Sequence, residues 1–423
     1  MKVKKGFASK VRACYEAVLT MRPPKGFRES PYPYHHELEI LIDSVTNLGI
    51  GIARDDNWVI HVPFVLPGER IRARIYRNHK NYSDADCLEV LEPSPQRVTP
   101  RCDLFGVCGG CQYQAVNYQT QLIWKQRHVA ESFLRIGGIE AKVNPTIASP
   151  KRFAYRSKLT PHYEKTPDFE NRKVGFLRQG SRRILVDVPS CPIATDPINA
   201  ALPAERESLR AQTRGKKKGG TLLLRDTLEG VITDPKKTVS EKVRNLIFQF
   251  KAGEFFQNNP FILPQLVEHV IAEANPNLCR VLVDAYCGGG LFGLSAASQF
   301  ERVIGIEISR DGFEGARTNA LLNKIDNAEF FLGDAGSIFS ELDREREPYA
   351  LVIDPPRKGC DANFIDQTLS FRPRRIVYVS CDPATQARDA KLLLQGGYRI
   401  LQMQPFDLFP QTRHIENVLT LEI

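Results

Sequence analysis

The C-terminal part of the chain alternates short apolar strands with helical stretches, and this alternation constrains the fold more than any other feature. Near-continuous apolar segments such as VLVDAYCGGG and ALVIDPP are separated by helix-like stretches such as DGFEGARTNALLN and ATQARDAKLLLQGG. Strands that are apolar throughout are buried on both faces, which is typical of a parallel sheet covered by helices. We therefore predict that residues 253–423 form an α/β domain with a doubly wound, Rossmann-like sheet.

Ligands of such sheets bind at the carboxyl ends of the strands. Five side chains are expected along that edge, namely Asp284, Glu307, Asp334, Asp354 and Cys381. A glycine motif, G-x-G-x-x-G, follows the first strand at Gly288, Gly290 and Gly293. Its glycines let an adenosine-bearing ligand approach the backbone, and Glu307 can bind two ribose hydroxyls. The motif alone fits a nicotinamide dehydrogenase equally well. The Asp-Pro-Pro run at Asp354 and the cysteine at Cys381 instead indicate methyl transfer from S-adenosylmethionine.

The chain has ten cysteines, and three of them lie close together. Cys102, Cys108 and Cys111 form C-x5-C-x2-C, with glycines that let the backbone curl around a metal centre. Cys191, which precedes a proline, is the best candidate for a fourth ligand. Four thiolates suit an iron-sulfur cluster or a structural zinc ion, and the x5 gap favours the cluster. That these cysteines bind no metal remains an alternative.

The charge balance favours a polyanionic partner. Lys and Arg number 58 against 49 Asp and Glu, a net charge of +9, and such an excess favours phosphate contacts. The densest basic tract, RGKKKGG at residues 214–220, is predicted to be a loop that is either solvated or in contact with phosphate. Residues 1–35 are interpreted as a basic N-terminal extension. Because no apolar run is long enough for a membrane span and no signal peptide is recognisable, we expect a soluble, cytoplasmic protein without a membrane partner.

Residues 36–93 contain five short β-rich stretches, which predict a small closed barrel. The LGIGIAR turn and the VPFVLPGERIRARI segment resemble a TRAM domain, an OB-like RNA-binding barrel. The resemblance implies RNA contacts on basic strands and loops, for which four arginines are suitable: Arg70, Arg72, Arg74 and Arg77. The alternative is a structural barrel with exposed arginines.

Residues 94–252 are predicted to form a mixed α+β central domain that carries the cysteines. Helical periodicity in NYQTQLIWKQRHVAESFLRIGG ends at Gly137 and Gly138, as at a helix C-cap. From about residue 147 the pattern changes to short alternating strands with turn glycines, which indicates a largely antiparallel arrangement.

Five segments together resemble the RNA uracil-5-methyltransferase family, which makes 5-methyluridine in ribosomal or transfer RNA. They are GEFFQNNP, VDAYCGGGLFG, VIDPPRKGCD, YVSCDPATQARD and DLFPQTRHIENV. With the barrel and the cysteines, the resemblance covers most of residues 36–423. It implies S-adenosylmethionine as methyl donor, RNA as partner and a 4Fe-4S cluster on the four cysteines. It slightly favours 23S-type ribosomal RNA over the T-loop of transfer RNA. No obligate protein partner is evident, and we expect a monomer.

The chemistry of uracil explains the cysteine at the sheet edge. Carbon 5 is a poor nucleophile, but a thiolate that adds to carbon 6 makes an enolate whose carbon 5 can attack a sulfonium methyl group. Cys381 is suited to this addition, and the resemblance implies that Glu416 is the base that removes the carbon-5 proton. An alternative for Glu416 is a structural ion pair with Arg413 or His414. The resemblance also implies S-adenosylmethionine contacts at Gln257, Tyr286, Glu307, Asp334 and Asp354, whereas Leu291 replaces a frequent asparagine.

Four other functions share some of these sequence features but differ in others. DNA cytosine-5-methyltransferases share an E-N-V run but place a Pro-Cys pair after the fourth strand, where Pro356 is followed by Arg357. RNA cytosine-5-methyltransferases keep a second cysteine beside that proline, and Cys360 is four residues too far. Amino-group methyltransferases require an aromatic residue at the position of Arg357. A non-catalytic RNA-binding module would not need Cys381 and Glu416 together.

Overall fold

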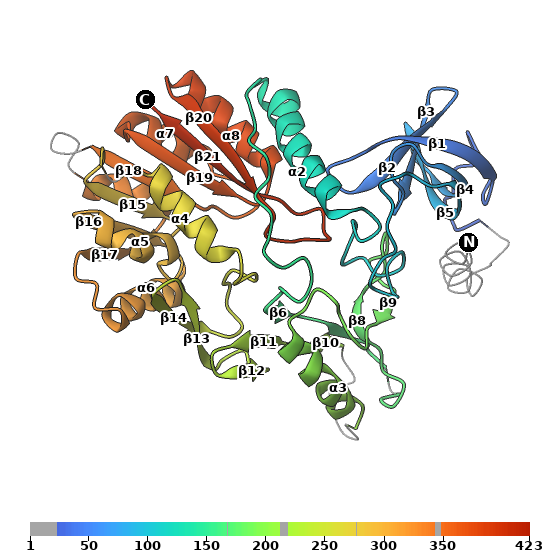
Figure 1. Ribbon diagram of the computed structural model, residues 1–423, viewed down its shortest axis with the longest axis horizontal. Coiled ribbons are helices and arrows are strands. Elements are labelled where there is room, and N and C mark those ends of the chain that lie inside the picture. Colours follow the sequence, from blue (N-terminus) through green and yellow to red (C-terminus); the bar gives the residue numbers. More distant parts are fainter. Residues whose placement is uncertain (1–22, 167, 212–218, 276, 343–347) are drawn as a thin grey trace.

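The computed structural model describes residues 23–423 except residue 167, residues 212–218, residue 276 and residues 343–347. The first 22 residues of the basic extension and residues 214–218 of the basic tract lie outside the described residues. A barrel lies at one end of the molecule and a large sheet at the other, with the central domain between them (Figure 1). Among the described helices, none has the length and apolar character that a membrane crossing requires.

The barrel is closed, as predicted from its five β-rich stretches. Its strands are β1 (Glu37–Val45), β2 (Ile50–Asp55), β3 (Trp58–Pro63), β4 (Arg70–Asn78) and β5 (Tyr82–Glu92). Their order is β1-β2-β3-β5-β4, and only β3 and β5 pair in parallel. Alternate side chains point inward because strand side chains have a period of two. The buried interior includes Ile42, Ile60, Val62, Ile71 and Ile75.

Three of the four arginines expected to contact RNA are paired with acids of the neighbouring strand. The ion pairs are Arg70–Glu92, Arg72–Glu89 and Arg74–Asp86, with N–O distances of 2.6, 2.9 and 3.8 Å. Strand β5 places an acid near each of these arginines, which partly neutralises the outer face of β4. Arg77 is exposed and has no such ion pair among the described residues. RNA contact by these four arginines stays a prediction, and acids of β5 partly offset the charges of three of them.

The first element of the central domain is helix α2 (Tyr118–Ser132), which continues into a π-helical turn, η1 (Phe133–Gly137). Asn117 begins the helix by accepting a hydrogen bond from the Thr120 amide at 2.9 Å. Gly138 ends it in the left-handed region, with φ of 68°, where glycine carries no Cβ penalty. The predicted helix and its glycine C-cap are confirmed.

The rest of the central domain consists of short antiparallel strands and one helix. They are β6 (Lys158–Leu159), β7 (His162–Tyr163), β8 (Val174–Leu177), β9 (Leu185–Asp187), α3 (Asp196–Arg210), β10 (Gly220–Thr221), β11 (Leu224–Thr227), β12 (Gly230–Ile232), β13 (Thr238–Val243) and β14 (Leu246–Lys251). They form sheets β10-β7-β8-β9, β12-β11-β6 and β13-β14. The mixed and largely antiparallel character inferred from the sequence is confirmed.

The C-terminal sheet has seven strands in the order β17-β16-β15-β18-β19-β21-β20. Their bounds are β15 (Val281–Ala285), β16 (Arg302–Glu307), β17 (Ala328–Leu332), β18 (Tyr349–Ile353), β19 (Arg375–Ser380), β20 (Arg399–Phe406) and β21 (Glu416–Glu422). Strands β15 to β19 are parallel, whereas β21 is antiparallel to both neighbours. The short connection from β20 to β21 lacks a crossover helix, so it can join only antiparallel strands.

Helices cover both faces of this sheet, which makes it doubly wound as predicted. The helices are α4 (Leu263–Glu273), α5 (Leu291–Ala296), α6 (Arg310–Leu322), α7 (Ala362–Phe371) and α8 (Pro383–Gln395). Within β19, Ile376 and Tyr378 pack into one buried cluster with α7, α8 and η1. Val377 and Val379 point to the opposite face and pack with α4 and α5. Turn η1 therefore joins the central domain to the same core as α8.

Helix α2 also holds the segment between β20 and β21, residues 407–415, which we call the connecting segment. Lys125 donates to Asp407 at 2.5 Å, with both side chains fully buried, and to the Phe409 carbonyl at 3.1 Å. One turn earlier, the Gln121 amide exchanges two hydrogen bonds of 3.1 Å with Gln411. Because the next residue after the connecting segment begins β21, these contacts set the position of that strand's first side chain.

We expect Lys125→Met to lower the free energy of unfolding by about 3–5 kcal/mol, because it leaves Asp407 as a buried charge without its cation. Lys125→Met combined with Asp407→Leu should recover most of this loss, since both charges are then absent. Arg310→Met, which breaks the exposed pair with Glu314, is the matched control and should change stability by less than about 1 kcal/mol. Urea denaturation measures the free energy of unfolding of each variant. If Lys125→Met alone is as stable as Arg310→Met, the prediction is contradicted.

Candidate active site

The register between β19 and β21 brings a thiol and a carboxyl group together. Ser380 pairs with Asn417 across these antiparallel strands, so Cys381 and Glu416 occupy the next position at the same edge of the sheet. Gln386 of α8 locks this register, because its side chain exchanges hydrogen bonds with Asn417 on β21 at 2.8 and 3.2 Å. Two residues far apart in sequence thus become neighbours.

The Cys381 thiol is half-buried, and burial raises its pKa to about 11. The charges of Glu416 and Asp354 act in the same direction. Arg357, which follows the Asp-Pro-Pro run, opposes them through its charge and a hydrogen bond to the thiol. The thiol is therefore protonated at neutral pH, and Arg357 is the group that favours its thiolate form.

Glu416 and Asp354 form a pair of carboxyl groups that titrate together. Glu416 is only 3% exposed, and burial raises its pKa well above the usual value, with a further rise from the charge of Asp354. Loss of solvation raises the pKa of Asp354 to about 7. Carboxyl groups buried this close together oppose each other's ionisation. The positive charge of Arg357 lowers the pKa of Glu416 and so offsets part of the rise that burial and Asp354 cause.

The proposed structural ion pair of Glu416 does not form. Arg413 and His414 are both described by the structure, and neither makes an ion pair with Glu416. Burial and nearby cations lower the pKa of His414 to about 3, so its imidazole is neutral. The carboxyl group of Glu416 is therefore not committed to a neighbouring cation on its own loop.

The glycine loop after β15 meets the carboxylate that ends β16. Glu307 accepts hydrogen bonds from the Gly288 amide at 2.9 Å and the Ser309 amide at 2.7 Å. Gly290 begins α5 with φ of 84°, a conformation that favours glycine. Leu291, which stands where many relatives by resemblance carry asparagine, is the first residue of α5 and is half-buried.

Asp284 lies beneath this loop and is completely buried. Its Oδ2 accepts a hydrogen bond from the Gly293 amide at 2.8 Å, whereas its Oδ1 has no partner among the described residues. Burial raises the pKa of Asp284 to about 7, and the charges of Asp354 and Glu307 add to the rise. An unsatisfied buried oxygen is costly. Asp284 thus supports the glycine loop from below through the Gly293 amide.

Three other expected cofactor contacts come from separate segments of the chain. Tyr286 adopts a left-handed backbone with φ of 67°, and its ring packs on Phe364 at 5.4 Å between centroids. Asp334 accepts the Gly336 amide at 3.0 Å and begins the short helix η3 (Ala335–Glu341). Gln257 is 5% exposed, in the segment that precedes α4. The charge of Asp334 adds to the rise in the pKa of the Tyr286 hydroxyl, which burial causes in the main.

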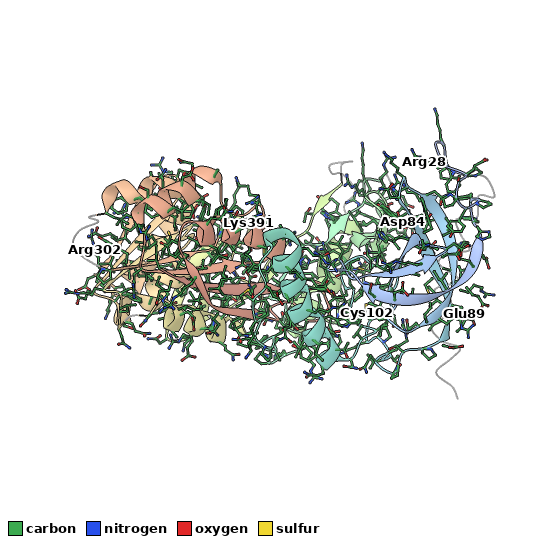
Figure 2. The ribbon with its side chains drawn as sticks, turned by 90° about the horizontal axis from the view of Figure 1, so that it is seen from above. Arg28, Asp84, Glu89, Cys102, Arg302 and Lys391 are labelled. Carbon is green, nitrogen blue, oxygen red and sulfur yellow. The ribbon has the colours of Figure 1, made fainter. Side chains whose placement is uncertain are left out.

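The four candidate metal ligands, Cys102, Cys108, Cys111 and Cys191, are gathered in one place. Burial raises the pKa of all four thiols, and the charge of at least one other cysteine adds to the rise at Cys108, Cys111 and Cys191. Backbone amides point at three of the sulfurs: those of Leu104 and Phe105 at Cys102, that of Gly110 at Cys108, and those of Ile193 and Ala194 at Cys191. Figure 2 shows Cys102 between α2 and the barrel.

This donor set fits an iron-sulfur centre, because thiolates that accept amide hydrogen bonds are the usual ligands of such clusters. Within the described part of the chain, no three His, Cys, Asp or Glu side chains are arranged to hold a metal ion. The four thiols therefore offer the chemistry of a cluster, but they are not in the arrangement of a metal site in this structure.

Sequence reasoning missed Arg357 as a functional residue. It treated this arginine only as the absence of an aromatic side chain after the two prolines. The sequence did offer one indication of its role. Arg357 follows the Asp-Pro-Pro run at the end of β18, and Cys381 follows the neighbouring strand β19. The role of Lys125 carried no such signal, because its partner Asp407 lies 282 residues away.

Comparison with known proteins agrees with this geometry. The family model of the tRNA (Uracil-5-)-methyltransferases matches residues 207–423, and the TRAM domain model matches residues 36–88. The tRNA (uracil(54)-C(5))-methyltransferase of Schizosaccharomyces pombe is 40% identical over 418 residues, covering 92% of this chain and 79% of the relative. The enzyme of the same name from Saccharomyces cerevisiae is 32% identical over 473 residues, covering 92% and 74%.

A solved structure shares the whole architecture. The Pyrococcus abyssi tRNA (uracil-54, C5)-methyltransferase in complex with S-adenosyl-L-homocysteine has a TM-score of 0.70 at 24% identity. The match covers 91% of this chain and 100% of that chain. At this identity the likeness establishes the fold.

The sheet, the glycine loop and the thiol–carboxyl edge define an S-adenosylmethionine-dependent RNA methyltransferase. The matched family model and relatives show that the chain belongs to the tRNA (uracil-5-)-methyltransferase family. It is therefore an RNA uracil-5-methyltransferase, which excludes the dehydrogenase, cytosine, amino-group and non-catalytic alternatives.

Arg357→Gln should slow alkylation of Cys381 by iodoacetamide at pH 8. Removal of the guanidinium raises the pKa of the thiol further, and each unit of rise lowers the thiolate fraction about tenfold. We expect a decrease of about 3–10-fold, with the rate of the wild type rising steadily toward the thiol pKa of about 11. Lys358→Gln, one residue along, is the control. Quantitative peptide mass spectrometry measures the rate, and equal rates in both variants would rule out the proposed action of Arg357.

Proposed function

We propose that this enzyme methylates carbon 5 of uridine 54 in the T-loop of transfer RNA through a covalent adduct with Cys381. The names of the two fungal relatives, at 40% and 32% identity, support this substrate. The preference for 23S-type ribosomal RNA inferred from the sequence is not confirmed by them. The observation that carries the mechanism is the juxtaposition of Cys381, Arg357 and Glu416 at one edge of the sheet.

The first step is addition of the Cys381 sulfur to carbon 6 of uracil. Arg357 donates to the thiol and favours the thiolate, which is the attacking form. Formation of the sulfur–carbon bond breaks the 5,6 double bond and places the electron pair in an enolate over carbon 5. Because Cys381 is half-buried at the sheet edge, the uridine must leave its stack to reach it.

S-adenosylmethionine supplies the methyl group to carbon 5. The residues that would hold it are Tyr286 and Glu307 at the glycine loop, together with Gln257, Asp334 and Asp354. The carboxylate of Glu307 is held by two amides, so it is oriented for ribose hydroxyls before any ligand binds.

Glu416 completes the reaction by taking the proton from carbon 5. Loss of this proton restores the 5,6 double bond and breaks the carbon–sulfur bond, so Cys381 returns as a thiolate. A carboxyl group with a raised pKa is a stronger base than an ordinary one. Burial and the charge of Asp354 both raise the pKa of Glu416, so its carboxylate binds a proton more readily than an exposed one.

Methyl transfer from labelled S-adenosylmethionine tests the substrate and the nucleophile together. Unmodified transfer RNA should acquire 5-methyluridine, and transfer RNA with cytidine at position 54 should not. Cys381→Ala should remove all methylation, whereas Cys360→Ala, at the other cysteine of this region, should retain it. Label in 23S-type ribosomal RNA alone would overturn the proposed substrate, and activity without Cys381 would overturn the mechanism.

Glu416→Gln should lower the rate by about 10²–10⁴-fold, the usual contribution of a general base. The methylated adduct should then accumulate as a protein–RNA complex that survives denaturation. Wild-type enzyme should give a similar complex only with RNA that contains 5-fluorouridine, since fluorine blocks the final elimination. A Glu416→Gln enzyme that releases product normally would show that another group removes the proton.

We also propose that Cys102, Cys108, Cys111 and Cys191 hold a 4Fe-4S cluster. The gathered thiols and the amides directed at their sulfurs support this assignment. The group would act structurally, because methyl transfer requires no net electron flow. It would fix the loop whose Gln112 and Tyr113 amides bond to the Gln411 carbonyl at 3.1 and 3.0 Å, and so support the connecting segment.

Anaerobically purified protein should contain about four iron and four sulfide per chain by colorimetric analysis. Cys111→Ser should lose most of the iron, whereas Cys381→Ser should keep it although it cannot methylate RNA. Zinc in place of iron, or equal iron in both variants, would refute the cluster.

A further inference from the structure

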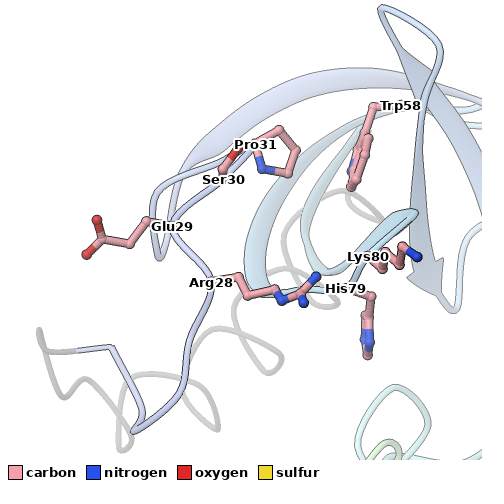
Figure 3. Close-up of a pocket in the computed structure, with 7 residues that line it drawn as sticks. All are labelled: Arg28, Glu29, Ser30, Pro31, Trp58, His79 and Lys80. Atoms are coloured by element: carbon pink, nitrogen blue, oxygen red, sulfur yellow. The ribbon is translucent and has the colours of Figure 1, made fainter.

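Two adjoining cavities lie between the barrel and the segment that precedes it, residues 24–36, which we call the N-terminal strap. Their volumes are about 520 and 580 Å³. Arg28 of the strap and His79 and Lys80 of the β4–β5 turn line both of them. Figure 3 shows the first cavity, which Trp58 and Pro31 also line. We call the two cavities together the strap pocket.

A buried hydrogen-bond chain builds this pocket. Asn78, which is 5% exposed, donates to the carbonyl groups of Arg28 and Tyr32 at 2.7 Å each. It accepts a hydrogen bond from the Ser83 hydroxyl at 2.6 Å, and Ser83 accepts one from the indole of Trp58 at 2.9 Å. The strap is thereby fixed to the barrel, and the ring of Trp58 is held in place along the cavity wall.

A second aromatic ring, that of His79, lines the first cavity together with Trp58. His79 stacks on Tyr82 with 4.3 Å between centroids and 17° between planes, and Tyr82 lies 4.3 Å from His61. His79 is oriented by Asp84 at 2.7 Å. Ordered rings at the edge of a small barrel offer stacking surfaces for unpaired bases.

The cations of the pocket are not neutralised. The second cavity is lined by four of them and by no acid: Lys25, Arg28, Arg77 and Lys80. None of the four forms an ion pair with a described residue, in contrast to Arg72, which pairs with Glu89. Figure 2 shows Arg28 and Glu89 on different sides of the barrel. The acid of the first cavity, Glu29, points away from Arg28 and His79 in Figure 3.

We propose that the strap pocket binds an unpaired nucleotide of the substrate RNA, with its base against the aromatic rings and its phosphates on Arg28 and Lys80. Free cations select a polyanion, and ordered rings beside them select one that carries bases. The proposal rests on the proposed RNA substrate and adds a second contact to it. None of the residues that line the pocket belongs to the reacting edge of β19 and β21, so this contact serves binding and not the chemical step.

Arg28→Gln combined with Lys80→Gln should weaken binding of unmodified transfer RNA about tenfold at moderate salt. The slope of log Kd against log salt concentration should fall by about 1.4, because each single-stranded phosphate contact contributes about 0.7. The rate at saturating RNA should not change. Arg70→Gln with Arg72→Gln removes the same charge from the ion-paired strand and should have a smaller effect. Fluorescence anisotropy measures the Kd of each variant over a range of salt concentrations. Equal slopes for the pocket variant and the wild type would overturn the proposal.

The base contact is tested separately through the fluorescence of Trp58, which is one of two tryptophans. RNA should quench wild-type emission, and Trp58→Phe should lose most of this quenching. Heparin, a polyanion without bases, should compete for the cations without quenching. Quenching that persists in Trp58→Phe, or that heparin reproduces, would overturn the base contact. Failure of the wild type to methylate transfer RNA would refute the proposed substrate and leave these binding measurements interpretable with the RNA that does react.

Discussion

The buried ion pair between Lys125 and Asp407 is the interaction on which the active site depends. It joins a helix of the central domain to the connecting segment, which ends one residue before Glu416. Two charges without solvent are stable only while they face each other. This pair therefore favours one arrangement of α2 against the sheet. The two hydrogen bonds between Gln121 and Gln411 stabilise the same arrangement. The central domain thus acts as a support for the reacting edge.

Crowding of carboxyl groups is the second constraint on that edge. Asp284, Asp354 and Glu416 all have raised pKa values because they are withdrawn from water near one another. Arg357 is placed where it lowers the pKa of both Cys381 and Glu416. Burial raises the pKa of both groups, which makes Glu416 a stronger base but lowers the thiolate fraction of Cys381. Arg357 lowers the pKa of the thiol and so recovers part of that thiolate fraction.

In the barrel, basic residues that follow one another in the sequence do not form an unpaired basic surface. A run of arginines at alternate positions of β4 indicated a basic face, yet β5 places acids beside Arg70, Arg72 and Arg74. The free cations lie instead at the strap and the β4–β5 turn, where residues from two separate segments meet. Local patterning could not reveal this, because cross-strand pairing depends on the register of the closed barrel.

The sequence by itself determined the local elements and their order: apolar strands that end in acids or cysteine, a glycine loop, a capped helix and a barrel of alternating strands. Periodicity and turn chemistry act over a few residues, so they can be read directly from the chain. Only the tertiary structure decided that β21 runs antiparallel beside β19 and sets Glu416 next to Cys381. It also decided that Lys125 meets Asp407 across 282 residues. Contacts of this kind depend on which distant segments share one core, and no local pattern encodes that choice.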